Sequence, residues 1–420
     1  MRTCVACFLA IVVVTWAVIV VKVLVLDRDD EVPFLDQDIR EPQTKFGVGL
    51  SGWDFIEKLY AIGIESPGKL AKLLEEEDPF KVAVDAPMAF QCPKSEADRF
   101  SLPDVRNHDM EEVFKRGEGF IYYQHLRKAG GTGFCEMASR QVEGRNDVPD
   151  YHCMPDERGA MATPPWSSMD FLLETMRREG FRITANEWDA FPLEHLSYPD
   201  AVFGTTFRHP VDRWYSQYRF EHVEHRDGTK AGDEVMPFKK WYKRVGPYTM
   251  GDNYYVKTFC GQANPEDEEL EKRKNHLGQP QYVRDLYWSY HKFNSWGSKV
   301  AWEDLKAAME VLRKFHLILI LDFVQDEAWA LERALGWNQE RKQVLPHEKQ
   351  AVRKDKKSIS AREALPSDVW EEILNANVFD LLLFHWAKRL YLERSACRSV
   401  DVESISNLPP KIPDTMESNA

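Results

Sequence analysis

The chain is 420 residues long, with 43% hydrophobic residues, 12% aromatic residues and 13 Trp. This composition excludes a disordered chain, because enough apolar surface is present to form a large core. The length allows one large domain with appendages or two domains. A formal net charge of −13 argues against a general nucleic-acid binder, which carries a basic excess. Lys and Arg can still gather around an anionic ligand in one local site.

The sequence opens with an apolar segment over residues 4–26, which is interrupted only by Thr15 and Lys22. About 20 apolar residues are enough to cross a bilayer as a helix. Arg2 precedes the segment and acidic residues follow it, which favours a cytoplasmic N-terminus. A cleaved signal peptide, which is the alternative, has a shorter apolar core and a small-residue cleavage site. We therefore predict a cytoplasmic tip and a signal-anchor transmembrane helix within residues 1–26.

This topology places the rest of the chain in an oxidising compartment, where disulfides form and persist. Five cysteines follow the predicted anchor, namely Cys92, Cys135, Cys153, Cys260 and Cys397. Because five is an odd number, at least one of them stays free or pairs with another chain. Their spacing matches no zinc-binding motif, and it does not indicate which cysteines pair.

A polar stem follows the anchor and extends over residues 27–115. Within it, apolar residues recur at helical spacing between residues 51 and 74. Ser66 can cap a second helix, with Pro67 in its first turn. We predict a short helical pair here, whose role the sequence does not reveal.

A domain of alternating strands and helices follows, over residues 116–396. The predicted strands are residues 120–125, 181–185, 201–207 and 315–321, and the predicted helices are residues 133–140, 169–179, 211–221 and 301–314. Apolar strands that alternate with helices indicate a parallel sheet with both faces covered. The fold class is therefore α/β, and residues 397–420 are expected to form a flexible C-terminal tail.

The first strand runs into a loop of small residues and then into a helix. The loop is Arg127-Lys128-Ala129-Gly130-Gly131-Thr132-Gly133. Exposed backbone N–H groups and the N-terminus of a helix favour a bound anion, and Lys128 adds a full positive charge. The order of residues differs from the P-loop of nucleotide triphosphatases, in which Lys-Ser/Thr ends the loop. A plain loop is the alternative, and we interpret His125, before the loop, as structural support.

A second candidate phosphate-binding segment follows the third strand, about 80 residues later. It reads Arg208-His209-Pro210-Val211-Asp212-Arg213 and continues into a helix that carries Ser216. Pro210 fits the first turn of that helix. Arg208, at the end of the strand, and Ser216, about two turns along, can converge on one phosphate. The alternative is that the arginines pair with surface acids.

Together these two segments resemble the donor-binding elements of Golgi carbohydrate sulfotransferases of the heparan and chondroitin type. In that family a strand ends in a Lys-x-Gly/Ala-Gly/Ser-Thr turn, and a later strand is followed by Arg-x-Pro-x-x-Arg and then by Ser. Residues 252–261, 307–337 and 373–384 are similar to later parts of the family and mostly concern packing. The resemblance covers roughly residues 118–395.

The resemblance implies a P-loop-like sheet and transfer of a sulfuryl group from PAPS (3′-phosphoadenosine 5′-phosphosulfate) to a glycan or polysaccharide hydroxyl. It further implies that Lys128 neutralises the leaving phosphate, that residues 127–133 hold the 5′-phosphate, and that Arg208 and Ser216 hold the 3′-phosphate. No metal and no nucleic acid are expected. The expected location is the Golgi membrane, as a single-pass type II protein with a luminal catalytic domain. A protein-tyrosine sulfotransferase and an inactive glycan-binding relative are the alternatives.

The general base is expected on or just after the second strand, because relatives carry a Glu or His there. Glu187 lies at this position, and the neighbouring Trp188 is expected to raise its pKa towards neutrality. A structural Glu is the alternative interpretation. His152, His195 and Asp189 are the other candidates for the base.

Overall fold

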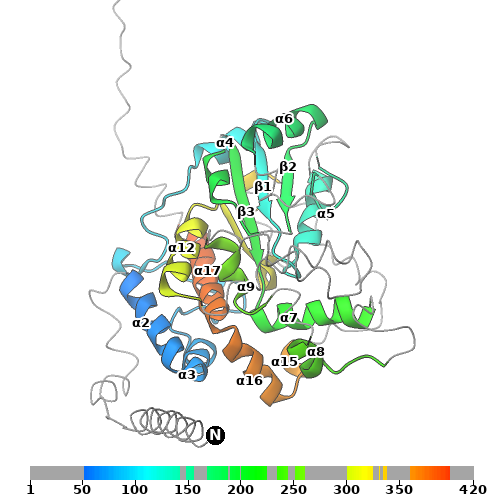
Figure 1. Cartoon of the computed structure of the whole chain (residues 1–420). Coiled ribbons are helices and arrows are strands. Elements are labelled where there is room, and N and C mark those ends of the chain that lie inside the picture. Colours follow the sequence, from blue (N-terminus) through cyan, green and yellow to red (C-terminus); the bar gives the residue numbers. More distant parts are fainter. Residues whose placement is uncertain are drawn as a thin grey trace, which may run out of the picture. The chain divides into compact units, whose positions relative to one another are not determined.

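The computed structural model describes residues 52–141, 148–155, 168–187, 190–198, 200–224, 234–244, 251–260, 300–324, 331, 334–337 and 360–397. The chain divides into two units, Met1–Leu50 and Ser51–Ala420, and every described residue belongs to the second (Figure 1). The predicted anchor and residues 398–420 of the predicted tail lie outside the described residues. Cys397, the first residue of that predicted tail, is buried and bonded to Cys92. Within the described ranges, no helix is both long and apolar enough to span a membrane.

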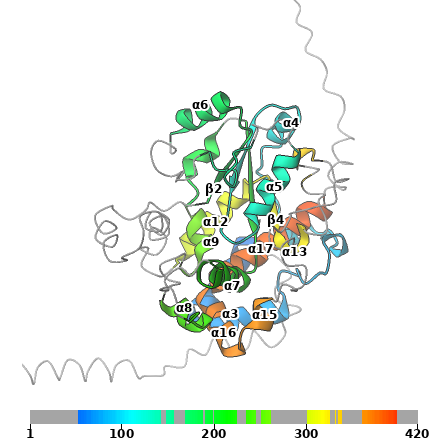
Figure 2. The ribbon, with the colours of Figure 1, turned by 90° about the vertical axis from the view of Figure 1, so that its right-hand side faces the viewer.

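Four parallel strands form the sheet at the centre of the second unit. They are β1 (Phe120–Gln124), β2 (Ile183–Asn186), β3 (Ala201–Phe207) and β4 (Leu317–Ile320), in the order β2-β1-β3-β4. Every residue of the four strands is buried, as expected for a parallel sheet covered on both faces. Helices flank the sheet in both views (Figures 1 and 2). The predicted α/β fold is therefore confirmed.

The order of the strands brings two loops together at one edge of the sheet. The chain passes from β1 to β2 on one side, then crosses to β3 on the other side of β1. Gln124, the last residue of β1, lies opposite Thr205 of β3, so both strands end at the same edge. In Figure 1 these carboxyl ends point towards α7 (Pro210–Tyr218). Ligands of open α/β sheets bind at such a point, where the strand order reverses.

The helices begin and end at residues that the local sequence favours. Those preceding β3 are α2 (Gly52–Glu65), α3 (Pro67–Lys72), α4 (Asp109–Lys115), α5 (Gly131–Gln141) and α6 (Met169–Glu179). Those following it are α7, α8 (Phe238–Arg244), α9 (Tyr254–Phe259), α12 (Trp302–Arg313), α13 (Leu321–Val324), α15 (Ala361–Ala364), α16 (Ser367–Ala376) and α17 (Val378–Ala396). The hydroxyl of Ser168 caps α6, which ends at Gly180 in the left-handed conformation. The four predicted helices thus correspond to α5, α6, α7 and α12.

The helical pair predicted between residues 51 and 74 is present and belongs to the hydrophobic core. The hydroxyl of Ser66 accepts a hydrogen bond of 3.4 Å from the amide of Lys69 and so caps α3, with Pro67 in its first turn. Tyr60 of α2 stacks on Phe379 of α17 with 4.7 Å between the ring centroids. Both helices contact α17, and α3 also contacts α16. The pair therefore packs on the same core as the sheet.

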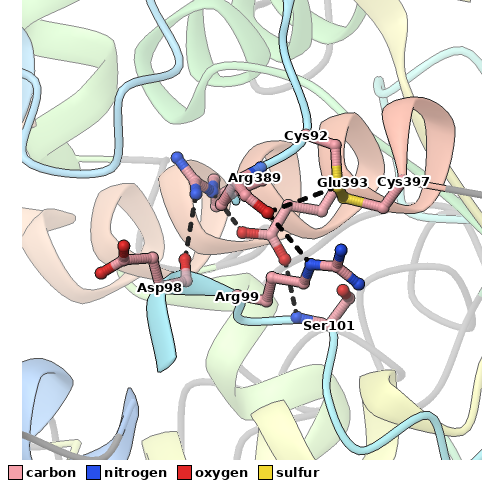
Figure 3. The surroundings of a disulfide bond; sticks show 8 residues. Cys92, Asp98, Arg99, Ser101, Arg389, Glu393 and Cys397 are labelled. Carbon is pink, nitrogen blue, oxygen red and sulfur yellow. Dashed lines mark hydrogen bonds and ion pairs between the residues drawn. A yellow bond between two sulfur atoms is a disulfide. The ribbon is translucent and has the colours of Figure 1, made fainter. Parts of the chain in front are cut away.

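Two disulfides join segments of the second unit, Cys92–Cys397 and Cys135–Cys153, and the buried Cys260 takes part in neither. This agrees with the odd count of cysteines after the predicted anchor. Near Cys397, Glu393 accepts hydrogen bonds from Arg389 Nε at 2.6 Å and from the amide of Ser101 at 2.8 Å (Figure 3). The end of α17 is thus attached to the segment around residues 92–101 both covalently and through a buried charge.

Candidate functional site

The loop after β1 turns sharply before α5 begins. The amide of Ala129 donates to the carbonyl of Leu126 at 3.1 Å, which closes the turn. Lys128 has a φ of 60° and Gly130 a φ of 99°. Glycine adopts positive φ without steric cost, whereas a lysine there needs support from its surroundings. The strained Lys128 backbone is the first sign that this loop is held by contacts to other elements.

Close packing explains the two glycines of the loop. A Cβ at Gly130 would lie 2.8 Å from Leu321 Cδ1, and one at Gly131 would lie 1.8 Å from Cδ2 of His125. The buried His125 ring therefore occupies the space that a side chain at position 131 would need. This contact supports the interpretation of His125 as a structural residue of the loop.

The start of α5 offers backbone donors beside the lysine. The amides of Gly131, Thr132 and Gly133 have no acceptor within the helix, because they belong to its first turn. Lys128, Gly130 and Thr132 keep part of their surface exposed, whereas Ala129, Gly131 and Gly133 are buried. The partial positive charge of the helix N-terminus adds to the charge of Lys128. This arrangement suits an anion in contact with the loop.

The loop after β3 lies directly beside the loop after β1. Arg208 donates a hydrogen bond from Nη1 to the carbonyl oxygen of Lys128 at 3.3 Å. The strands beneath are linked as well, since the hydroxyls of Tyr123 and Thr206 lie 2.7 Å apart. Pro210 occupies the first turn of α7, as predicted. The two candidate phosphate segments, 80 residues apart in sequence, therefore form one surface.

The two other polar residues of the second segment have different surroundings. Ser216 is half-buried on α7. Arg213 is fully buried, and its guanidinium carbon lies 4.7 Å from the ring centroid of Tyr254 and 5.4 Å from that of Tyr255. Arg213 is thus buried between α7 and the two tyrosine rings of α9, and not on the surface.

Lys128 lies over an aromatic ring that the sequence did not single out. Its Nζ atom is 4.0 Å from the ring centroid of Phe220, a favourable cation–π geometry. Phe220 belongs to a π-helical segment, Arg219–Glu224, that continues α7. Helical bulges of this kind are frequent at functional sites. The ammonium of Lys128 is therefore held towards the segment that follows α7.

Arg127 links two buried carboxylates from different elements. Its Nη1 lies 3.4 Å from Oε1 of Glu187, just after β2, and its Nη2 lies 3.5 Å from Oε1 of Glu221. Gln217 also donates a hydrogen bond to Glu221. All three charged side chains are buried. The side chain of Arg127, a predicted cofactor-binding residue, thus points inward and orders Glu187, while its backbone stays in the loop.

The electrostatics of Glu187 differ from our expectation. Burial raises the pKa of its carboxyl, but the neighbouring His125 and Arg127 outweigh burial, so this pKa lies below its ordinary value. Burial lowers the pKa of His125 to about 4, and Arg127 is therefore the partner that is positively charged at neutral pH. The expected rise in the pKa of Glu187 is wrong, because a salt bridge to a buried guanidinium dominates.

The alternative bases lie in different places. The His152 ring centroid is 6.2 Å from that of His125, so His152 borders the site. His195 is fully buried and stacks on Tyr198 with 4.5 Å between the ring centroids, within the core. Asp189, like Trp188, lies outside the described residues. The structure thus places His152 near Glu187 and His195 away from the loops.

Several residues of the site carried no signal in the sequence. Phe220 and Glu221 contact the loop after β1 from the π-helical segment that follows α7. Tyr254 and Tyr255 contact the two loops from α9. A single aromatic or acidic residue on a helix is ordinary. Only the Gln217–Glu221 pair, four residues apart on one helix face, indicates that these two side chains act together.

The fold and these contacts define an α/β protein that presents two joined, basic loops where the order of its parallel strands reverses. No protein-family model matches the sequence, and no curated protein matches it significantly. Among the described residues, no group of three or more His, Cys, Asp or Glu is arranged to hold a metal ion.

Proposed function

We propose that this chain is a sulfotransferase that moves a sulfuryl group from PAPS to a hydroxyl of a glycan or polysaccharide. The observation that carries the proposal is the hydrogen bond between Arg208 and the Lys128 carbonyl. It joins two segments whose sequences resemble the two phosphate-binding elements of the carbohydrate sulfotransferases. They lie where open α/β sheets bind nucleotides.

The glycine-rich loop fits the 5′ end of such a donor. A Cβ at Gly130 or Gly131 would meet a neighbouring side chain, so the packing requires glycine at both positions. Because these glycines have no side chain, a phosphate can approach the amides at the start of α5. Lys128 neutralises charge on the phosphate that leaves, and Thr132 adds a hydroxyl donor. Arg208 and Ser216 bind the 3′-phosphate and so distinguish PAPS from nucleotides that lack it.

In the proposed reaction, the sulfur–oxygen bond to the leaving phosphate breaks as the acceptor oxygen bonds to sulfur. Glu187 takes the proton of the acceptor hydroxyl. Its carboxylate is ionised at neutral pH because of Arg127. An anionic donor beside Lys128 adds negative charge nearby and raises this pKa towards the range of an efficient base. His152 is the second candidate for this role.

The remaining parts of the proposal rest on the sequence. The apolar segment at residues 4–26 anchors the protein as a single-pass type II protein in the Golgi membrane, with the sulfotransferase domain in the lumen. The two disulfides are consistent with an oxidising compartment. The assignment to carbohydrate rather than protein tyrosine rests on resemblance alone, so both acceptor classes belong in the test.

The test is transfer of label from radiolabelled PAPS to a panel of polysaccharides and tyrosine peptides. We expect labelled polysaccharide, and we expect Lys128→Ala and Arg208→Ala each to reduce transfer by about 10²–10³-fold. The matched controls are Lys72→Ala and Arg178→Ala, because both side chains lie in exposed ion pairs outside the site. Both controls should retain full transfer.

Three outcomes would change the conclusion. Absence of both PAPS binding and transfer would overturn the sulfotransferase proposal. Transfer of label to tyrosine peptides alone would show that the acceptor is a protein and not a glycan. PAPS binding without transfer to any acceptor would favour an inactive, glycan-binding relative.

A further inference from the structure

Two adjacent tyrosines at the start of α9 each hold one of the two loops. The Tyr254 hydroxyl accepts a hydrogen bond of 3.3 Å from the amide of Arg127, in the loop after β1. The Tyr255 hydroxyl donates one of 2.7 Å to the carbonyl of Arg208, in the loop after β3. Both tyrosine side chains are fully buried. One turn of helix thus contacts the backbone of both candidate phosphate loops.

The start of α9 is itself fastened to α17 by reciprocal hydrogen bonds. Asp380 accepts from the amide of Tyr255 at 2.9 Å and from that of Val256 at 3.0 Å. In return, the side-chain oxygen of Asn253 accepts from the amides of Phe379 and Asp380, each at 3.1 Å. Each helix therefore caps the other, and two amides in the first turn of each helix find an acceptor on the other.

Asn377, the residue just before α17, completes this attachment. The side-chain oxygen of Asn377 accepts from the amide of Asn253 at 3.1 Å and from Trp214 Nε1 at 3.0 Å, which links α9 to α7. Asn377, Asn253 and Asp380 are all buried. Because hydrogen bonds hold this backbone in place on several sides, the two tyrosine rings project from a rigid base.

We propose that Tyr254 and Tyr255 are positioning residues that set the separation of the two phosphate loops. This inference rests on the proposed function and deepens it. A donor with a 5′- and a 3′-phosphate gains from both loops only when their spacing matches its own. If the loops are already held at that spacing, the second phosphate is bound without a further cost of ordering the protein. A nucleotide with one phosphate gains nothing from the spacing.

The two tyrosines should therefore act differently. Tyr254 holds the 5′ loop, which every adenine nucleotide with a 5′-phosphate uses. Tyr255 holds the backbone of Arg208, which only a 3′-phosphate uses. Loss of the Tyr254 hydroxyl should weaken both kinds of nucleotide, the bisphosphate at least as much as the monophosphate, whereas loss of the Tyr255 hydroxyl should weaken only the bisphosphate.

The experiment measures the dissociation constants of adenosine 3′,5′-bisphosphate and adenosine 5′-phosphate with the full-length chain. For Tyr255→Phe we expect the preference for the bisphosphate to fall about 5–10-fold, with monophosphate binding unchanged, since one hydrogen bond is lost. For Tyr254→Phe we expect both affinities to fall, that of the bisphosphate at least as much as that of the monophosphate. The control is Tyr60→Phe, because the Tyr60 hydroxyl donates to the carbonyl of Val300 at 2.9 Å, away from the loops.

Failure of the inference and failure of the proposed function are distinguishable. If the wild-type protein binds neither nucleotide, or binds both equally, the proposed donor site is wrong. If it prefers the bisphosphate and Tyr255→Phe keeps the full preference, the positioning role is wrong. Phenylalanine keeps the buried ring, and circular dichroism checks the fold. If either variant fails to fold, Asp380→Asn replaces it, and an unchanged preference in that variant likewise overturns the role.

Discussion

The ring of His125 lies so close to Gly131 that a methyl group on Gly131 would be 1.8 Å from Cδ2 of the ring. His125 is also held by its amide, which donates to the carbonyl of Asn186 at 3.0 Å. The backbone of His125 is thus fixed, and its ring is buried, so close packing leaves the ring little room to move away. The absence of a side chain at position 131 is a packing requirement of the loop.

Gly131→Ala should therefore destabilise the protein and weaken nucleotide binding together. Overpacking of this kind costs about 1–3 kcal/mol, which thermal unfolding would detect. The matched control is Gly68→Ala in α3, where the new Cβ would meet its nearest neighbour, Asn375, at an ordinary 3.7 Å. That variant should be neutral or slightly more stable, because Ala favours a helix over Gly. Equal stability of the two variants would contradict the packing argument.

Glu187→Gln should abolish most transfer while PAPS binding is retained. The amide keeps the shape of the carboxyl but cannot take a proton, and loss of a general base costs about 10²–10⁴-fold in rate. Turnover and donor dissociation constants measured separately would show this split. Undiminished turnover would move the role of the base to His152, which His152→Ala would then test.

The two disulfides should contribute unequally to stability. Cys92–Cys397 closes a sequence separation of 305 residues, and Cys135–Cys153 closes one of 18. In the chain-entropy account a disulfide that closes a longer loop stabilises the protein more, and the difference between these two is about 2.5 kcal/mol. Replacing both cysteines of a pair by alanine and measuring denaturant unfolding would compare them. A larger loss for the Cys135–Cys153 pair would show that local structure outweighs loop length.

His316 should make stability fall as the pH falls below neutrality. Its Nδ1 accepts from the amide of Phe203 at 3.0 Å and its Nε2 lies 2.9 Å from the carbonyl of Asn107, so the folded state needs the neutral ring. Burial lowers the pKa of His316 to about 4. Between pH 6.5 and 4 the unfolded chain binds a proton that the folded chain does not.

Protonation of this one group should then lower the free energy of unfolding by about 1.4 kcal/mol for each unit that the pH falls within that window. Urea titrations at pH 7, 6 and 5 measure the slope. The side chain in His316→Gln does not titrate in this pH range, so the free energy of unfolding of this variant should depend less on pH than that of the wild-type protein. An identical slope in both would mean that other groups carry the acid sensitivity.

Much of the fold followed from local sequence. Apolar runs predicted all four strands, although the second begins at Ile183 and the last at Leu317, two residues later than expected. Pro210 and Ser66 marked the helix starts correctly. The strand order could not be predicted, because it depends on contacts between segments far apart in the chain.

The sequence predicted the two loops of the candidate site but not the residues that hold these loops in place. Lys128 and Arg208 stood out because charged residues at strand ends, beside glycines or a proline, suit phosphate binding. The inward orientation of the Arg127 side chain could not be predicted, since its partners Glu187 and Glu221 are 60 and 94 residues away in the sequence. The same holds for Tyr254 and Tyr255, whose hydroxyls reach the two loops only because α9 is packed on α17.

The sequence by itself determined the four strands, the four helices predicted beside them and the chemical character of the two loops, because backbone propensity and hydrophobic periodicity act within a few residues. The tertiary structure alone decided which charges pair, that the pKa of Glu187 is lowered, and that Arg208 binds the Lys128 carbonyl. These depend on distance and burial, and both arise only when helices from remote parts of the chain close around the end of the sheet.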